Sequence, residues 1–206
     1  MNRREILAAL ALTAAAPYGM AQAQDTTTAT DVAIPDMVLG SPDAPVKMTE
    51  YASYTCPHCQ RFHTDVFKYL KTDYIDTGKV QFTFREVYFD RYGLWAAMMA
   101  RCGGDMKYFG ISDILYNTQS EWLSADDPAV VIENLKKIGR TAGMDDATLE
   151  ACFNDKAKAE AMVAAYQANA TADGIEGTPT LIINGTKHSN MSYEELKAII
   201  DPLIAG

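Results

Sequence analysis

The chain has 206 residues, 48% of them hydrophobic, which suits one compact domain with a buried core and room for an insertion. It carries 27 acidic and 18 basic residues, for a formal net charge of -9, and it has no long basic run. We therefore expect no binding to nucleic acid, and we attribute the acidity to solubility rather than to a particular partner.

The first 23 residues have the organisation of a cleavable signal peptide. Arg3 and Arg4 give a positive start, and residues 6–16 form an apolar stretch that is too short to span a bilayer. Residues 21–23 have the small-x-small pattern of a cleavage site. The arginine pair resembles a twin-arginine signal, although the general secretory route fits slightly better. The alternative to cleavage is an uncleaved membrane anchor.

The folded part begins with a strand and a helix. Residues 24–37 are Thr-rich, lack apolar periodicity and predict a flexible N-terminal segment. Turn-forming residues at 40–45 precede an alternating run at 46–52, which predicts a strand. A helix is predicted from Pro57 to about Leu70, because proline is tolerated in a first helical turn, where its missing N–H would have no partner.

A long helical block separates this first part from a second group of strands. Residues 80–85 alternate as a strand, and residues 93–174 show helical periodicity in five segments. Strand character returns at 180–183, followed by the hairpin turn Asn184–Gly185 and a final helix capped by Ser192.

This order predicts an α/β domain that is interrupted once. The strands before and after the block are too few to form separate stable sheets, so they must share one. We predict a domain formed by residues 38–92 and 175–206, with residues 93–174 inserted as an all-helical domain.

The most informative motif is Cys56-Pro57-His58-Cys59. Two thiols one helical turn apart can form and break a disulfide with little backbone movement. Cys56 falls at the start of the predicted helix, where unpaired backbone N–H groups stabilise a thiolate. These residues predict thiol–disulfide exchange.

Two further cysteines, Cys102 and Cys152, lie in the helical block. In an exported chain, an even number of cysteines favours disulfides. Four cysteines allow three pairings, of which 56–59 with 102–152 is the most economical. We interpret the second pair as structural; a regulatory redox role and two free thiols are the alternatives.

Glu50 falls on the same alternating face of the first strand as three small or apolar residues, Val46, Met48 and Ala52. Its carboxylate is either buried, with a raised pKa, or exposed at a strand end. We favour the buried position, from which Glu50 could accept a proton from Cys59.

The strand followed by Cys-Pro-His-Cys, the helical insert, the sequence 177–180 (Gly-Thr-Pro-Thr) before a hairpin and the C-terminal helix together resemble the DsbA family of periplasmic thiol–disulfide oxidoreductases. The resemblance covers residues 38–203. It implies a thioredoxin fold, in which helices flank a central mixed sheet, with an inserted helical domain.

The resemblance also implies roles for the motif residues. Cys56 would be the exposed nucleophile and Cys59 the buried resolving thiol, with Pro57 and His58 tuning the pair. Glu50 matches the buried acid beneath the active site of the family.

Three other features follow from the same resemblance. Pro179 matches a cis-proline that faces the active-site disulfide, and Thr178 precedes it in the substrate-binding loop. The best-known strong oxidases of the family carry Val at the position of Thr178, whereas Thr is common in related isomerases and in some DsbA-like proteins, so an oxidase remains the favoured interpretation. Cys102 and Cys152 match a subgroup that has a second, non-catalytic disulfide.

The predicted function is the introduction of disulfides into exported proteins in the periplasm by a monomer. The redox-active disulfide Cys56–Cys59 would serve without a separate cofactor. Reduced or unfolded exported proteins would be the substrates, and a membrane quinone-linked reoxidase of the DsbB type would be the second partner.

Two other functions remain open. A disulfide isomerase or reductase fits Thr178, although such isomerases usually add a dimerisation domain for which this chain has no room. A metal carrier would use the cysteine pair as ligands, and zinc could be imagined on Cys56, Cys59, His63 and His188. We expect no metal, because His63 fits equally well as an ordinary helix residue.

Overall fold

The computed structural model describes residues 32–205. The predicted signal peptide, residues 1–23, and most of the predicted flexible segment lie outside these residues. No helix within the described part is both long and apolar enough to cross a membrane.

A five-stranded mixed sheet forms the centre of the fold, as the predicted fold class requires. The strand order is β1-β3-β2-β4-β5, in which β2 and β3 are parallel and the other neighbours are antiparallel. The strands are β1 (Met37–Leu39), β2 (Val46–Ala52), β3 (Val80–Glu86), β4 (Thr180–Ile183) and β5 (Thr186–Ser189). Strands from both ends of the chain therefore share one sheet, since β2 pairs with β4 over residues 48–51.

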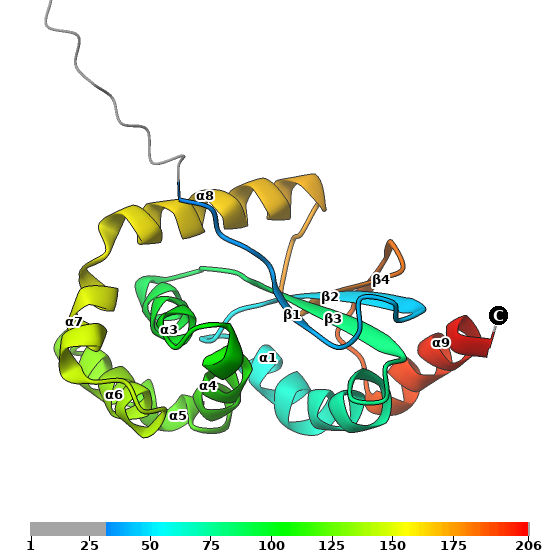
Figure 1. Cartoon of the computed structure of the whole chain (residues 1–206), viewed down its shortest axis with the longest axis horizontal. Helices are drawn as coiled ribbons and strands as arrows, with labels where there is room; N and C mark the ends of the chain where they lie inside the picture. Colours follow the sequence, from blue (N-terminus) through cyan, green and yellow to red (C-terminus); the bar gives the residue numbers. More distant parts are fainter. Residues whose placement is uncertain (1–31, 206) are drawn as a thin grey trace, which may run out of the picture.

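Helices cover both faces of the sheet (Figure 1). One side is covered by the helical run after β2, which comprises α1 (Pro57–Phe62), η2 (His63–Phe67), α2 (Lys68–Leu70) and η3 (Lys71–Ile75), and by α9 (Tyr193–Ala205). On the other side lies α8 (Lys156–Ala172), where the hydroxyl of Tyr51 of β2 donates to Asp173 and to the carbonyl of Asn169. Alternate residues of β2 thus face different helical layers.

Most of the inserted helices form a lobe beside the sheet, and the last of them, α8, runs across the face of the sheet opposite α1 and α9 (Figure 1). They run in chain order as α3 (Arg91–Cys102), α4 (Asp105–Asn117), α5 (Gln119–Trp122), α6 (Pro128–Thr141), α7 (Asp146–Asn154) and α8 (Lys156–Ala172). Cys102, at the end of α3, forms a disulfide with Cys152 in α7. Large side chains such as Trp122, Tyr108 and Leu135 are fully buried and belong to one apolar core that the lobe shares with the sheet.

The N-terminal edge of the domain differs from the prediction by one residue. Met37, placed at the end of the flexible segment, is 4% exposed and pairs with Phe84 as the first residue of β1. Before it, Asp36 forms an ion pair with Arg85 at 2.8 Å, and the carbonyl of Pro35 accepts a hydrogen bond from Arg101. A strand of three residues is too short to show an alternating pattern.

Candidate active site

Cys56 and Cys59 lie where β2 passes into α1. Cys56 is the N-cap of α1, with extended backbone dihedrals, and Pro57 occupies the first turn, as the sequence predicts. Both cysteines are free thiols; Cys56 is 9% exposed and Cys59 is fully buried. An attacking sulfur can therefore reach Cys56 but not Cys59.

The two thiols have opposite acidities. A hydrogen bond from Cys59 is the main cause that lowers the pKa of Cys56 to about 5; burial opposes it, and the side chain of Thr178 and the backbone N–H groups of Cys59 and His58 lower it further. Burial raises the pKa of Cys59 far above its ordinary value, and the hydrogen bond to Cys56 and the charge of Glu50 raise it further. When the reduced pair loses one proton, Cys56 therefore becomes the thiolate and Cys59 stays protonated.

The loop that precedes β4 closes the site. The Thr178–Pro179 peptide bond is cis, and the carbonyl of Thr178 lies 3.6 Å from Cys56 Sγ. The hydroxyl of Thr178 is buried and has no other partner within residues 32–205. Its proton is consequently free to turn towards the sulfur when Cys56 is a thiolate.

His58 contributes to the site through its backbone. Its imidazole is exposed, and Nδ1 accepts a hydrogen bond of 2.8 Å from Arg61, one turn further along the helix. Arginine has only donors, so Nδ1 must be the acceptor in this pair. It is the N–H of His58, rather than the ring, that contributes to the low pKa of Cys56.

Glu50 lies inside the sheet beneath the cysteines. Its side chain is 2% exposed, so of the two predicted positions for this carboxylate the structure shows the buried one. In the sheet, Glu50 is paired with Phe84 of β3 on one side and with Leu181 of β4 on the other. Burial raises the pKa of Glu50 to about 8, and the charge of Cys56 adds to the effect. Glu50 can therefore hold or release a proton near neutral pH.

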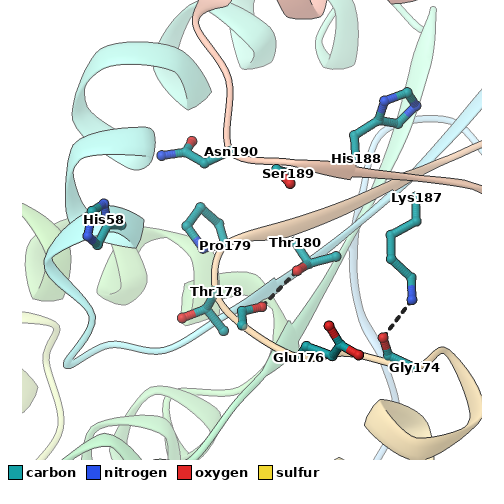
Figure 2. Close-up of a pocket in the computed structure, with 11 residues that line it drawn as sticks. His58, Gly174, Glu176, Thr178, Pro179, Thr180, Lys187, His188, Ser189 and Asn190 are labelled. Atoms are coloured by element: carbon teal, nitrogen blue, oxygen red, sulfur yellow. Dashed lines mark hydrogen bonds between the residues drawn. The ribbon is translucent and has the colours of Figure 1, made fainter.

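A groove with a volume of about 650 Å³ opens beside the pair, between His58 on α1 and the cis-proline loop (Figure 2). Lys187, His188 and Asn190 line the side formed by β5 and the residues after it. Loop and strand are joined by a hydrogen bond of 2.6 Å from Lys187 to the carbonyl of Gly174 (Figure 2). Thr178 also lines the groove, and because its carbonyl lies 3.6 Å from Cys56 Sγ, the groove opens next to that sulfur.

The two histidines considered as zinc ligands, His63 and His188, have other surroundings in the structure. His63 is 7% exposed, stacks between Phe67 and Tyr116, and bonds to Asp113 at 3.2 Å through Nε2. His188 lines the groove. Across residues 32–205, no three His, Cys, Asp or Glu side chains are grouped so that they could hold a metal ion.

Two residues of the helical lobe reach the site without a signal in the sequence. The amide of Gln119 donates to the carbonyls of Tyr54 and Cys56, at 2.8 and 3.1 Å, and so fixes the turn before the helix. Tyr116 lies on the preceding helix, with its hydroxyl buried. Only the docking of the lobe on the sheet brings them here, so local patterns could not identify them.

The comparisons with known proteins agree with this geometry. The family model described as Thioredoxin matches residues 33–202. A Rickettsia bellii protein that carries the name protein-disulfide oxidoreductase is 34% identical over 170 residues, which is 82% of this chain. Disulfide bond formation protein D of Bacillus subtilis is 27% identical over 180 residues and covers 82% of this chain and 77% of its own length.

A solved structure also has the fold of this chain. The crystal structure of alpha-DsbA1 from Wolbachia pipientis superposes with a TM-score of 0.77 and 31% identity, covering 84% of this chain and 94% of that one. The chain spans 64% of the Rickettsia bellii relative, which is therefore the longer protein. On this coverage and identity, the chain belongs to the thioredoxin family, among its DsbA-like members.

Proposed function

We propose that this protein is a dithiol oxidase that introduces disulfide bonds into exported proteins through Cys56 and Cys59. The observation that carries the proposal is the opposite acidity of the two thiols. A Cys56 pKa of about 5 makes this sulfur a good leaving group and stabilises the reduced enzyme, which is the property of an oxidant.

The reaction begins with the oxidised pair. A substrate thiolate attacks Cys56 Sγ, forming a mixed disulfide and breaking the Cys56–Cys59 bond. Cys59 leaves and takes a proton from Glu50, since its high pKa disfavours a buried thiolate. A second substrate thiolate then attacks the substrate sulfur, and Cys56 leaves as a thiolate. The substrate loses two electrons, and the enzyme ends as a dithiol.

The surroundings supply the binding surface. The groove beside Cys56 adjoins a second one that runs past Arg61, Tyr69 and Tyr193, and Asn190 lines both. Together they form a path beside the cis-proline loop for an unfolded chain. We assign substrate binding to Thr178 and Pro179, tuning of the pair to Pro57 and His58, and a structural role to the Cys102–Cys152 disulfide.

Export to the periplasm and the partners belong to the same proposal. The N-terminal signal sequence supports export. A membrane quinone-linked protein of the DsbB type would return the dithiol to the disulfide, and the chain would act as a monomer without a cofactor other than its own disulfide.

The equilibrium of the Cys56–Cys59 pair with reduced and oxidised glutathione tests the proposal. A strongly oxidising constant is expected. A reducing constant would replace the oxidase with a reductase or isomerase, the function towards which Thr178 points. Zinc or copper bound stoichiometrically to the purified protein would favour the metal carrier instead.

A further inference from the structure

Helix α4 places three hydroxyl groups in a row beneath the active site. Tyr108, Ser112 and Tyr116 are spaced by four residues, so they lie on one face of the helix. All three are buried, with exposed fractions of 0%, 3% and 1%. A buried hydroxyl without a hydrogen bond is costly, so each needs a partner.

The first two hydroxyls are satisfied within the protein. Tyr108 donates to Glu86 at 2.7 Å and accepts from Tyr54, whose hydroxyl also lies 2.6 Å from Ser112 Oγ. Glu86 is in turn paired with Arg101 at 2.6 Å. These contacts form a closed structural network between the lobe and the sheet.

The third hydroxyl has no partner within residues 32–205, although its ring is held firmly. The ring of Tyr116 packs against Tyr54 at 5.1 Å and His63 at 4.7 Å. The same ring packs against Phe84 at 6.4 Å, and Phe84 is the residue of β3 that pairs with Glu50, so the three side chains share one face of the sheet. Burial raises the pKa of the Tyr116 hydroxyl, and the charges of Cys59 and Glu50 add to the effect.

Glu50 is the matching acceptor. Its side chain is 2% exposed, and its neighbours across the sheet, Phe84 and Leu181, are apolar and offer it no side-chain hydrogen bond. A hydrogen-bond donor beside a buried carboxylate stabilises its charged form. The other titratable groups around Glu50 and Tyr116 are Cys56, Cys59, Tyr54 and His63, the last of which is bonded to Asp113.

We propose that Tyr116 is a positioning residue for proton transfer: its hydroxyl donates a hydrogen bond, through one bridging water molecule, to the carboxylate of Glu50. This bond keeps Glu50 able to accept the proton of Cys59 when Cys59 attacks a mixed disulfide at Cys56. In that step the Cys59–Cys56 bond forms, the bond between Cys56 and the other sulfur breaks, and the other sulfur leaves as a thiolate. The inference rests on the proposed function, in which Glu50 gives a proton to Cys59 when the Cys56–Cys59 bond breaks; here the same proton returns to Glu50 when that bond forms again.

The test is the pKa of Glu50 in the reduced protein, read from the carboxyl signal of 13C-labelled glutamate and assigned by its absence in Glu50→Gln. In Tyr116→Phe the pKa should rise by about one unit, as expected for the loss of one hydrogen bond to a charged group. An unchanged Glu50 pKa would overturn the proposal.

Tyr108→Phe is the matched control. It removes a hydroxyl from the same face of the same helix, but one that bonds to Glu86. It should lower stability and leave the Glu50 pKa unchanged. Equal shifts in both variants would show a general effect of the lobe and would also overturn the proposal.

A kinetic measurement separates this inference from the function itself. The rate at which the reduced protein reacts with oxidised glutathione should shift its pH midpoint upward in Tyr116→Phe, with no added shift in a Glu50→Gln background. An additional shift in that background would contradict the inference. Absence of exchange at every pH would defeat the proposed function, while the titration of Glu50 would still decide the role of Tyr116.

Discussion

The two pairs of cysteines differ in almost every physical respect. Cys56 and Cys59 are three residues apart, at the start of a helix and beside a groove, with one sulfur partly accessible. Cys102 and Cys152 are separated by 50 residues and join two helices of the lobe, where Cys152 is 5% exposed. The surroundings, rather than the sulfur atoms themselves, assign exchange to one pair and cross-linking to the other.

The largest expected difference between the pairs is in exchange itself. Cys56→Ser should abolish oxidation of a reduced, unfolded substrate, because it removes the sulfur that a substrate can reach. The double variant Cys102→Ala/Cys152→Ala should retain it. Substrate thiols counted over time measure both variants; equal losses of exchange would erase the distinction between the pairs.

For the stability of the fold, we expect the second pair of cysteines to matter more than the first. Removing the Cys102–Cys152 disulfide should lower the free energy of unfolding by at most ~4 kcal/mol, the chain-entropy value for a loop of this length. Chemical denaturation of the double variant, with the first pair kept reduced in both proteins, measures the effect. An unchanged denaturation midpoint would argue against a cross-linking role.

The redox state of the first pair should change stability in a pH-dependent way. The folded state lowers the pKa of Cys56 from 9.0 to about 5, so this group stabilises the reduced protein fully above pH 9 and not at all well below pH 5. Between pH 4 and 7 this group should therefore stabilise the reduced form, relative to the oxidised form, by ~2 kcal/mol, a value discounted for partial exposure of the sulfur.

Denaturation of both redox forms between pH 4 and 9 measures this difference. The raised pKa of Glu50 acts in the opposite direction, destabilising the folded state as pH rises from 4.5 towards 8, but it is present in both redox forms and largely cancels. A gap that does not widen with pH would mean that Cys56 is not the stabilised thiolate.

The smallest expected effect is a change in the Cys56 pKa that separates the contribution of the His58 backbone N–H from that of its imidazole. His58→Pro removes the N–H that contributes to the thiolate and should raise the Cys56 pKa by about one unit, whereas proline is tolerated in the first turn of α1. His58→Ala keeps that N–H and should change the pKa less. Thiolate absorbance measures both; a larger shift in His58→Ala would return the role to the imidazole.

Much of the fold could be read from the sequence because its signals are local. Alternation located β2 and β3, and the pair Asn184–Gly185, with φ of 44° and 83°, forms the turn between β4 and β5. Strand β1 and the four-residue helix α5 were missed, since both are too short to show a period. The π-helical segments η2 and η3 likewise have no signature in the sequence.

The site was predictable only as far as it is local. The motif placed Cys56 at a helix start, and the alternating face of β2 directed Glu50 inward. The loop carrying Thr178 came from a family resemblance, and Gln119 and Tyr116 could not be found at all, because they reach the site only through packing of the lobe. Residues that reach the site only through tertiary contacts cannot be identified from the spacing of residues in the sequence.

The most direct test of the account is a titration of Cys56 in the folded, reduced protein, followed by thiolate absorbance with Cys56→Ser as the blank. We expect a midpoint near pH 5, so that Cys56 is almost entirely anionic at pH 7. A thiol still protonated at pH 7 would contradict it.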